Sequence, residues 1–498
     1  MSATATESVD VAAETTAHSR RVMARGSLAM LSTQPFTWAA ALASAILVPR
    51  YLGADGLGRF TIAWTIALLA GSVTSVGLPQ FLMRRVASEP GRAAAYAWGG
   101  LVMVASSTLV IGSLLLLGVL LFHPAAVDLT ILMIGSVGVM MIVAQTVMSS
   151  VLMGTGRNRR YAVSTLSFTI LGAAFGLTAL VATSSAQGYA FGLLVGWAIA
   201  TVLLWRSSGL APCLEALDLR LLRELLVGGL PFAGYNLALA VRGQTDIALT
   251  GLLLQPSVAG WLAAAYRIIN AVVFIPTVIT TPLMPALSRA RAFPHAYRAL
   301  LGSSLAMVLL LTVPVSGMLL VLAPAIPGIL GWPAGLEHSV PLLMILAFQQ
   351  TLVAIDTVLG TSLIALRLEH SWLRVAVFGA IFNPGLNLVI IPLAQSLTGN
   401  GAIGAAGVEV TTELIFLACA VALTPRGLLG RDTLSVAART VACGLVLVAA
   451  GTLLRPFGLI LAVPAAGIAY MGAAVALGVL RPRQLRAVRL ALRGGMAA

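Results

Sequence analysis

The sequence predicts an all-α integral membrane protein. We expect about fourteen transmembrane helices in two pseudo-symmetric six-helix bundles plus a C-terminal helix pair, with both termini cytoplasmic. Hydrophobic residues make up 59% of the 498 residues and charged residues only 9%, too few to cover the surface of a soluble protein of this length. Apolar stretches of membrane-crossing length follow one another along the chain, and arginine concentrates in every second connection between them.

The apolar stretches give the helices in order, because a helix needs about 20 residues to cross roughly 30 Å of hydrocarbon. The predicted spans are 26–49, 60–83, 96–122, 129–153, 162–184, 188–206, 224–247, 259–283, 299–323, 338–361, 371–393, 403–424, 434–454 and 457–480. No connection is longer than roughly twenty residues. This leaves no room for a soluble catalytic domain or a large external loop.

The spans and their connections define the predicted organisation. The first residues are polar and acidic and lack the apolar core of a signal peptide, so we expect a disordered cytoplasmic tail. The predicted segments are 1–22 (tail), 23–206 (first bundle), 207–223 (cytoplasmic linker), 224–424 (second bundle), 425–480 (helices 13 and 14) and 481–498 (basic cytoplasmic tail).

The basic residues test this topology. All 30 are arginines, and the net charge is +14. All but Arg50, Arg59, Arg242, Arg267 and Arg455 fall in the N-terminal segment, alternate connections or the C-terminal segment. By the positive-inside rule this places both termini in the cytoplasm and favours an even number of spans. The charge therefore indicates anionic membrane lipids as partners, with the tail 481–498 lying along them, and no nucleic acid.

The sequence also contains a weak internal repeat. The stretch 48–66 aligns with 251–269 at an offset of about 202, so that Gly58 meets Gly260 and Trp64 meets Tyr266. Repeats of this kind are typical of transporters, in which two halves surround a central cleft and alternate its access.

Three motifs carry a resemblance to a known family. "PRYLGADGLGRF" (49–60), "TDIALTGLLLQPSVAGWLAAAYRI" (245–268) and "GNGAIGAAGVEVTTE" (399–413) resemble the motifs of polysaccharide (O-antigen-type) flippases of the multidrug/oligosaccharidyl-lipid/polysaccharide exporter superfamily. The second departs from the family pattern at Thr250 and Leu262. The run 265–290 also resembles the eighth helix of lipid II flippases.

The resemblance implies a multi-pass protein of the bacterial cytoplasmic membrane. It implies that this chain moves polyprenyl-pyrophosphate-linked oligosaccharide across that membrane by alternating access, driven by an ion gradient or the membrane potential. Such a flippase serves the synthesis of cell-envelope polysaccharide such as lipopolysaccharide. It needs no cofactor, and it works beside the polymerases and glycosyltransferases of its pathway.

The head of such a substrate is an anionic pyrophosphate with a polar sugar, and guanidinium groups suit phosphate because they bind its oxygens in a fork. Arg267 lies inside the eighth span, with Asn270 one turn further on the same side. Arg50 ends the first span, and Arg242 lies in the seventh. Each could equally be a structural ion-pair or interfacial arginine. The polar residues Gln34, Gln349, Gln350, Asn383 and Asn387 could line a hydrated sugar path or bond helices together.

Four acids fall inside spans, namely Asp246, Asp356, Glu409 and Glu413. An unpaired carboxylate at the bilayer centre costs about 3 kcal/mol, so each must be paired, hydrated or protonated. They are candidates for the proton or sodium site that couples transport to an ion gradient, and the alternative is a structural role. Arg242 and Asp246 are four residues apart and are expected to pair on one helix face.

Other functions remain open from the sequence. A lipid II-type flippase is one, although no arginine lies inside the first helix. A drug or small-molecule antiporter is another, and a membrane-embedded polysaccharide polymerase or ligase a third, although the long external loop of such enzymes is missing. The five histidines form no HExxH motif, no phosphate-binding loop occurs, and the three cysteines lack metal-ligand spacing. We therefore expect no enzyme activity, metal or cofactor.

Overall fold

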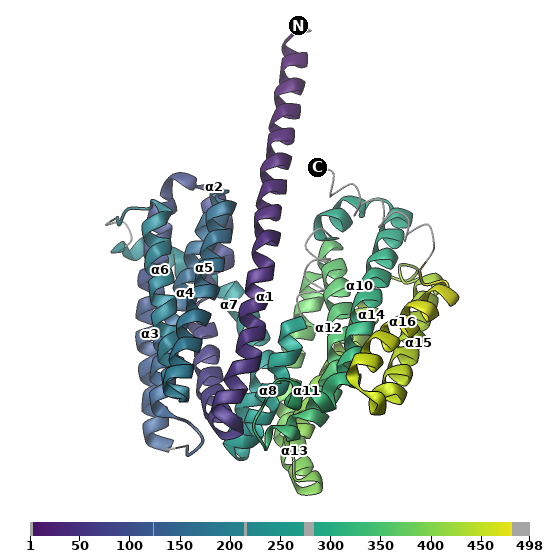
Figure 1. The fold of residues 1–498 in the computed structure, drawn as a ribbon. Coiled ribbons are helices and arrows are strands. Elements are labelled where there is room, and N and C mark those ends of the chain that lie inside the picture. The colour runs from purple at the N-terminus through teal and green to yellow at the C-terminus, as the bar shows by residue number, and fades with distance from the viewer. Residues whose placement is uncertain (1–2, 123, 214–216, 273–282, 481–498) are drawn as a thin grey trace. The chain divides into compact units, whose positions relative to one another are not determined.

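The computed structural model describes the backbone of residues 3–122, 124–213, 217–272 and 283–480, without the side chains of 3–33 and Asn158, and it contains no strand within these ranges. Figure 1 shows the helices. They are α1 (Ala3–Thr74), α2 (Leu78–Ser88), α3 (Ala93–Phe122), α4 (Leu129–Gly154), α5 (Asn158–Thr183), α6 (Ala186–Ser208), α7 (Leu219–Leu253), α8 (Pro256–Val272), α10 (Pro294–Leu322), α11 (Ile326–Ile329), α12 (Val340–Ala365), α13 (Glu369–Thr398), α14 (Ala402–Leu423), α15 (Arg431–Leu454) and α16 (Leu459–Ala476).

The chain is a multi-pass membrane protein with an all-α fold. Within the described residues, twelve helical segments are long and apolar enough to cross a membrane. The first of them, Gln34–Ser88, has 55 residues and contains residues 34–49 of the first predicted span and all of the second. The eighth predicted span corresponds to α8, whose 17 residues run up to 273–282, outside the described ranges. The count of fourteen, the pseudo-symmetry and the cytoplasmic termini stay predictions.

Gly53 divides the long first segment. At a rise of 1.5 Å per residue, 55 helical residues would extend about 80 Å, far more than one crossing requires. The helix is interrupted at Gly53, which has φ 62° and ψ −172°. A side chain makes this conformation costly, so it is confined almost entirely to glycine. The glycine in "RYLGADG" therefore ends the first crossing helix and begins the second.

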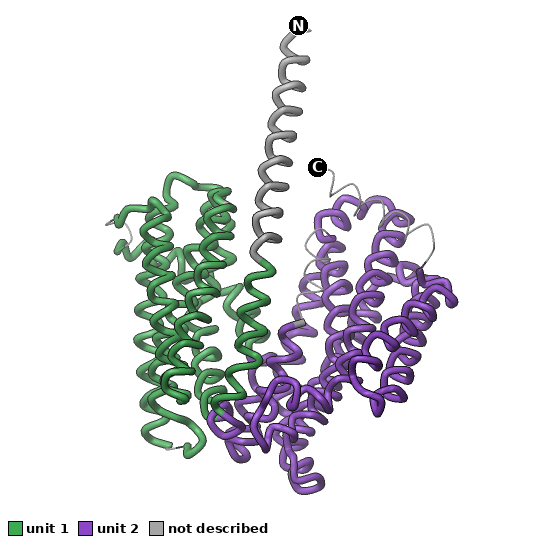
Figure 2. The backbone as a smooth tube through the Cα atoms, viewed as in Figure 1, with its two compact units in different colours: residues 1–52, 59–240 green, residues 53–58, 241–498 purple. Residues whose placement is uncertain are grey.

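The chain forms two compact units, shown in Figure 2. Unit 1 contains residues 1–52 and 59–240, and unit 2 contains residues 53–58 and 241–498. The boundary between the two units at residues 240 and 241 falls inside α7. The boundary predicted from the sequence pattern is the linker 207–223. The assignment of tails, bundles and an appended helix pair stays a prediction.

In unit 1, α5 and α6 are joined by small residues. A Cβ atom on Gly192 would collide with the carbonyl oxygen of Phe175, and one on Gly196 with that of Leu171. Together with Gly172 and Gly176 on α5, these glycines form two facing GxxxG pairs. Lipid is as apolar as a leucine side chain, so helices in a membrane associate through such close packing rather than through the hydrophobic effect.

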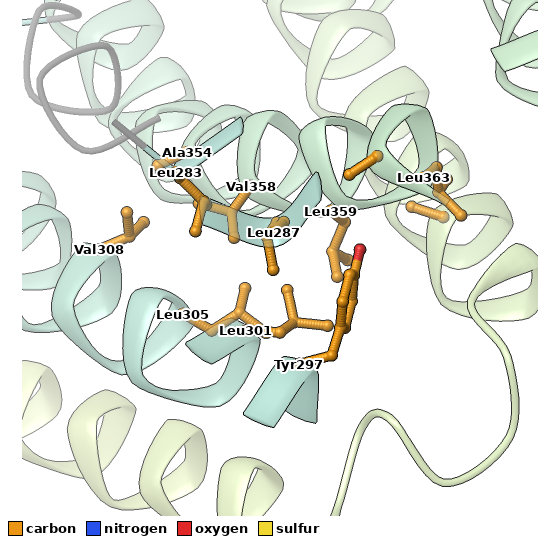
Figure 3. Packing of buried hydrophobic residues seen from close by; sticks show 12 residues of the cluster. Leu283, Leu287, Tyr297, Leu301, Leu305, Val308, Ala354, Val358, Leu359 and Leu363 are labelled. Carbon is orange, nitrogen blue, oxygen red and sulfur yellow. The ribbon is translucent and has the colours of Figure 1, made fainter. Parts of the chain in front are cut away.

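In unit 2, a buried apolar cluster joins α10 to α12 and to the helical residues 283–290 (Figure 3). Leu287, Leu301 and Leu363 are completely buried there. At the edge of the cluster, the hydroxyl of Tyr297 donates to the carbonyl oxygen of Ser362 at 2.9 Å. The buried phenol thereby has the partner that it needs away from water.

The outer surfaces of the helices are apolar. Large hydrophobic side chains are almost fully exposed on several helices, including Ile460 at 95%, Phe122 at 84% and Leu397 at 74%. A soluble monomer does not carry so much exposed hydrophobic surface. These side chains therefore face lipid, which accounts for the apolar composition of the whole chain.

The glycines that the repeat aligns pack against each other within unit 2. A Cβ on Gly58 would collide with the carbonyl oxygen of Pro256, and a Cβ on Gly260 with that of Ala54. Each such Cβ would also lie 3.1 Å from the backbone nitrogen of the other glycine. Ala54 and Pro256 are themselves separated by the repeat offset of 202. The contact is thus reciprocal, as a two-fold relation between these two short segments would make it.

Substituting either glycine tests this contact. We expect Gly58→Ala and Gly260→Ala each to destabilise the protein by about 1–3 kcal/mol or more, because the added methyl group meets backbone that cannot rotate away. The readout is the melting temperature of the purified protein in detergent. Gly407→Ala on α14 is the matched control, since its Cβ would have nothing within 4 Å. Equal melting temperatures for Gly58→Ala and the control would contradict the close packing.

Candidate functional site

Unit 2 contains a buried cluster of polar side chains within its apolar helices. We call it the carboxyl network. It draws residues from α7, α8, α12, α13 and α14, and its members are Arg242, Asp246, Tyr266, Gln349, Asp356, Asn383, Asn387, Glu409 and Glu413. All four acids proposed from the sequence are in it, each no more than 6% exposed.

Asp246 is bonded from two neighbouring helices. Its Oδ1 accepts a hydrogen bond from the amide nitrogen of Asn387 on α13 at 2.8 Å. Its Oδ2 accepts from the hydroxyl of Tyr266 on α8 at 3.0 Å. Asp246 therefore connects α7 to both helices, and the long apolar run around it supplies the burial.

Glu409 on α14 is bonded in a similar way. Gln349 on α12 donates its amide to Oε1 at 2.7 Å, and Asn383 on α13 donates to Oε2 at 3.1 Å. Asn387 also donates to the side-chain oxygen of Asn383 at 2.9 Å, because the two are one helical turn apart on α13. Since Asn387 also holds Asp246, the two carboxyl groups belong to one hydrogen-bonded chain.

Arg242 pairs with Glu413, not with Asp246 as the spacing along α7 predicts. Its Nη2 lies 2.7 Å from Oε1 of Glu413, whose side chain is 1% exposed. The guanidinium also lies over the ring of Phe416, 4.6 Å from the centroid. Residues four apart can pair on a helix, but Asp246 already has donors from α8 and α13, and the buried Glu413 on α14 has the greater need of a cation.

The network has more acceptors than donors. It contains four carboxyl groups and, among the described residues, one guanidinium. Both carboxyl oxygens of Asp356 are buried without a hydrogen-bond donor in the described part of the chain, as are the side-chain oxygens of Gln349 and Asn387. Asp356 also interacts with Glu413, and two carboxyl groups can hydrogen bond only when one holds a proton. The arrangement therefore suits the uptake of a small cation.

The structure does not bring the other predicted substrate residues into this network. Arg267 is half-buried on α8 and forms no ion pair or hydrogen bond with another described residue, and Asn270 is exposed on the same helix. Arg50 is exposed and belongs to unit 1. Gln349, also proposed for a sugar path, is already a member of the network, where its amide donates to Glu409. The substrate roles of these residues stay predictions, as does the ion-coupling role of the acids.

Tyr266 is the network residue that sequence reasoning missed. It is aligned with Trp64 in the repeat and directly precedes Arg267. Its place in an apolar span does indicate a polar contact, since a buried tyrosine hydroxyl needs a hydrogen-bond partner. No group of three or more histidine, cysteine or acidic residues that could hold a metal ion occurs in the described ranges.

Comparisons with solved structures give the fold a wider context. The chain is similar to a lipid II flippase, MurJ, in an inward closed conformation, with 14% identity, a TM-score of 0.72 and coverage of 89% of this chain and 97% of that one. It is also similar to a multidrug resistance MATE family transporter of the MOP superfamily in an inward-facing conformation, with 15% identity, a TM-score of 0.55 and coverage of 80% and 99%. At these identities the likeness concerns the fold.

A third similar structure is a MOP superfamily transporter from Pyrococcus furiosus, with 14% identity, a TM-score of 0.53 and coverage of 81% and 95%. No curated protein sequence matches the chain. A family profile does match it over residues 46–332, more than half of its length, and that family is described as "Polysaccharide biosynthesis protein". Because this profile covers more than half of the sequence, the chain belongs to the polysaccharide biosynthesis protein family.

Proposed function

We propose that this chain is a non-enzymatic flippase that moves polyprenyl-pyrophosphate-linked oligosaccharide across the bacterial cytoplasmic membrane by alternating access. The observation that carries the proposal is the combination of a polysaccharide biosynthesis family with a fold that flippases and transporters share. A polysaccharide built from lipid-linked units in the cytoplasm requires a carrier that takes each unit across the bilayer. The protein then supplies a polar route for the head of the lipid, while the polyprenyl tail stays in hydrocarbon.

Arg267 supports the substrate class. It is half-buried inside the apolar α8 and no ion pair with a described acid neutralises it. A partly dehydrated guanidinium without an acid is suited to a pyrophosphate, whose oxygens it can bind in a bidentate manner. Asn270, one turn further, can donate to the same group or to the first sugar.

The carboxyl network supports coupling to an ion gradient. Among the described residues, its four acids share one arginine and its unpaired atoms are oxygens, so binding of a proton or a sodium ion would lower the cost of burying the cluster. The network also ties five helices together. Its charge state can therefore affect how those helices pack, which is the requirement for linking cation binding to transport.

A second candidate function is a small-molecule cation antiporter. The observation that favours it is the same excess of buried carboxyl groups, because such groups bind organic cations as well as protons. Purified protein in liposomes separates the two functions. Translocation of a lipid-linked oligosaccharide without efflux of cationic dyes supports the flippase, and dye efflux without lipid translocation supports the antiporter.

Substitution of Arg267 tests its role in binding the substrate. We expect Arg267→Ala to slow translocation of a lipid-pyrophosphate oligosaccharide at least about tenfold, because a charged hydrogen bond to phosphate contributes about 1.5–3 kcal/mol. The measurement is the rate at which the sugar becomes accessible to an external glycosidase in proteoliposomes. Arg289→Ala, an exposed arginine of the same unit, is the control. Wild-type translocation by Arg267→Ala would remove Arg267 from the substrate site.

Substitution of Glu409 tests the coupling of transport to an ion gradient. Glutamine at position 409 imitates the protonated or cation-bound glutamate, so we expect Glu409→Gln to lose acceleration by an imposed gradient while remaining folded. Translocation is measured under a pH gradient, a sodium gradient and a membrane potential applied separately, which identifies the cation. The exposed Glu369→Gln on α13 is the control. Full acceleration of Glu409→Gln by the same gradient as wild type would contradict the coupling role.

Substitutions at the Arg242–Glu413 pair separate a structural role from a role in transport. Removing one partner leaves a buried charge, so Arg242→Met and Glu413→Met are each expected to destabilise the protein by about 3–5 kcal/mol. The double variant Arg242→Met/Glu413→Met should recover most of that stability, which the melting temperature reports. Translocation by the double variant then decides the role, since normal transport indicates a structural pair. A double variant less stable than both singles would refute the pairing.

A further inference from the structure

A second charged site lies in unit 1, remote in sequence from the carboxyl network. A cavity of about 520 Å³ opens between the first turns of α5 and the last turns of α6. Both helix segments border it because the two helices run antiparallel through a short turn at 184–185. Beyond it, the facing GxxxG pairs press the same helices together.

The polar lining of the cavity is cationic and rich in hydroxyl groups. Arg159 and Arg160 contribute two guanidinium groups, and Ser164, Ser167 and Ser207 contribute three hydroxyls. No acidic residue is among the lining residues. Arg160 is held in place because its Nη1 donates to the carbonyl oxygen of Ser208 at 3.0 Å, which leaves its other N–H groups for a ligand.

Ser164 provides an independent sign of a ligand. The residue is only 8% exposed, and its hydroxyl is buried with no hydrogen-bond partner in the described structure. Thr169 on the same helix donates to the carbonyl oxygen of Thr165, one turn back, at 3.0 Å, and Ser164 makes no such bond. A buried hydroxyl without that bond, on the wall of a cationic cavity, lacks a partner that an anionic oxygen would supply.

The apolar part of the lining indicates what kind of molecule carries the anionic group. Val163 and Leu203 border the cavity and are 55% and 52% exposed, on helices whose outer surfaces face lipid. A ligand that satisfies both linings has an anionic head beside Arg159 and Ser164 and a hydrocarbon chain along Val163 and Leu203. We propose that this cavity binds the phosphodiester headgroup of an anionic glycerophospholipid. This site does not depend on the proposed transport function.

Lipid titration of the purified full-length protein, followed by native mass spectrometry, tests the site. Phosphatidylglycerol is compared with phosphatidylcholine of the same acyl chains and with inorganic phosphate. We expect tighter binding of phosphatidylglycerol than of phosphatidylcholine, and no displacement of it by millimolar phosphate. Equal binding of the two lipids would overturn the proposal, and displacement by phosphate would show a site for the free anion instead.

Substitutions locate the binding in this cavity. Arg159→Gln keeps the Arg160–Ser208 bond and is expected to weaken phosphatidylglycerol binding about tenfold, and Ser164→Ala about threefold. Arg223→Gln, an exposed arginine of the same unit outside the cavity, should leave binding unchanged. If Arg159→Gln has a lower melting temperature than the wild type, phosphatidylglycerol binding by Ser164→Ala is used as the test. Loss of binding no greater in Arg159→Gln and Ser164→Ala than in Arg223→Gln would overturn the assignment.

Discussion

A carboxyl group buried in a membrane protein must find a donor or a cation, and unit 2 meets this requirement for the four acids of the carboxyl network only in part. The bonds that do form join α7, α8, α12, α13 and α14 through Asp246, Glu409 and Glu413. Within the described part of the chain, the network atoms without a hydrogen-bond partner are the carboxyl oxygens of Asp356 and two amide oxygens. The same network therefore holds the helices together and keeps a deficit of positive charge, and that combination makes it the candidate site for a coupling cation.

The apolar packing around the network gives it its properties. Burial of Leu287, Leu301 and Leu363 packs α10, α12 and the helix at 283–290 together. This packing holds α12 in place, and α12 carries Gln349 and Asp356. Neighbouring side chains leave each of the four network acids no more than 6% exposed. A charge in such surroundings interacts more strongly with its partners than it would at a surface. Rearrangement of one bond in the network is therefore energetically linked to the others.

The sequence was most informative where one helix or the bilayer alone decides the outcome. The predicted span 129–153 corresponds to α4 at Leu129–Gly154, because the thickness of the hydrocarbon sets the length of an apolar run. The four acids stood out because charge is rare in such runs. Their partners could not be predicted, because helical periodicity reports only neighbours on the same helix. It proposed Asp246 for Arg242, whereas the true partner, Glu413, lies 171 residues away on α14.

The reciprocal glycine contact has a consequence for how this chain can change. Gly58 and Gly260 are far apart in sequence, but a side chain at either one disturbs the same backbone-to-backbone interface. A second substitution therefore cannot compensate for the first. Once the first substitution has opened the interface, the second costs little further stability. The effects of substitutions at the two positions on stability are therefore non-additive. If the two segments arose by duplication, the close contact requires glycine at the matching position of each copy.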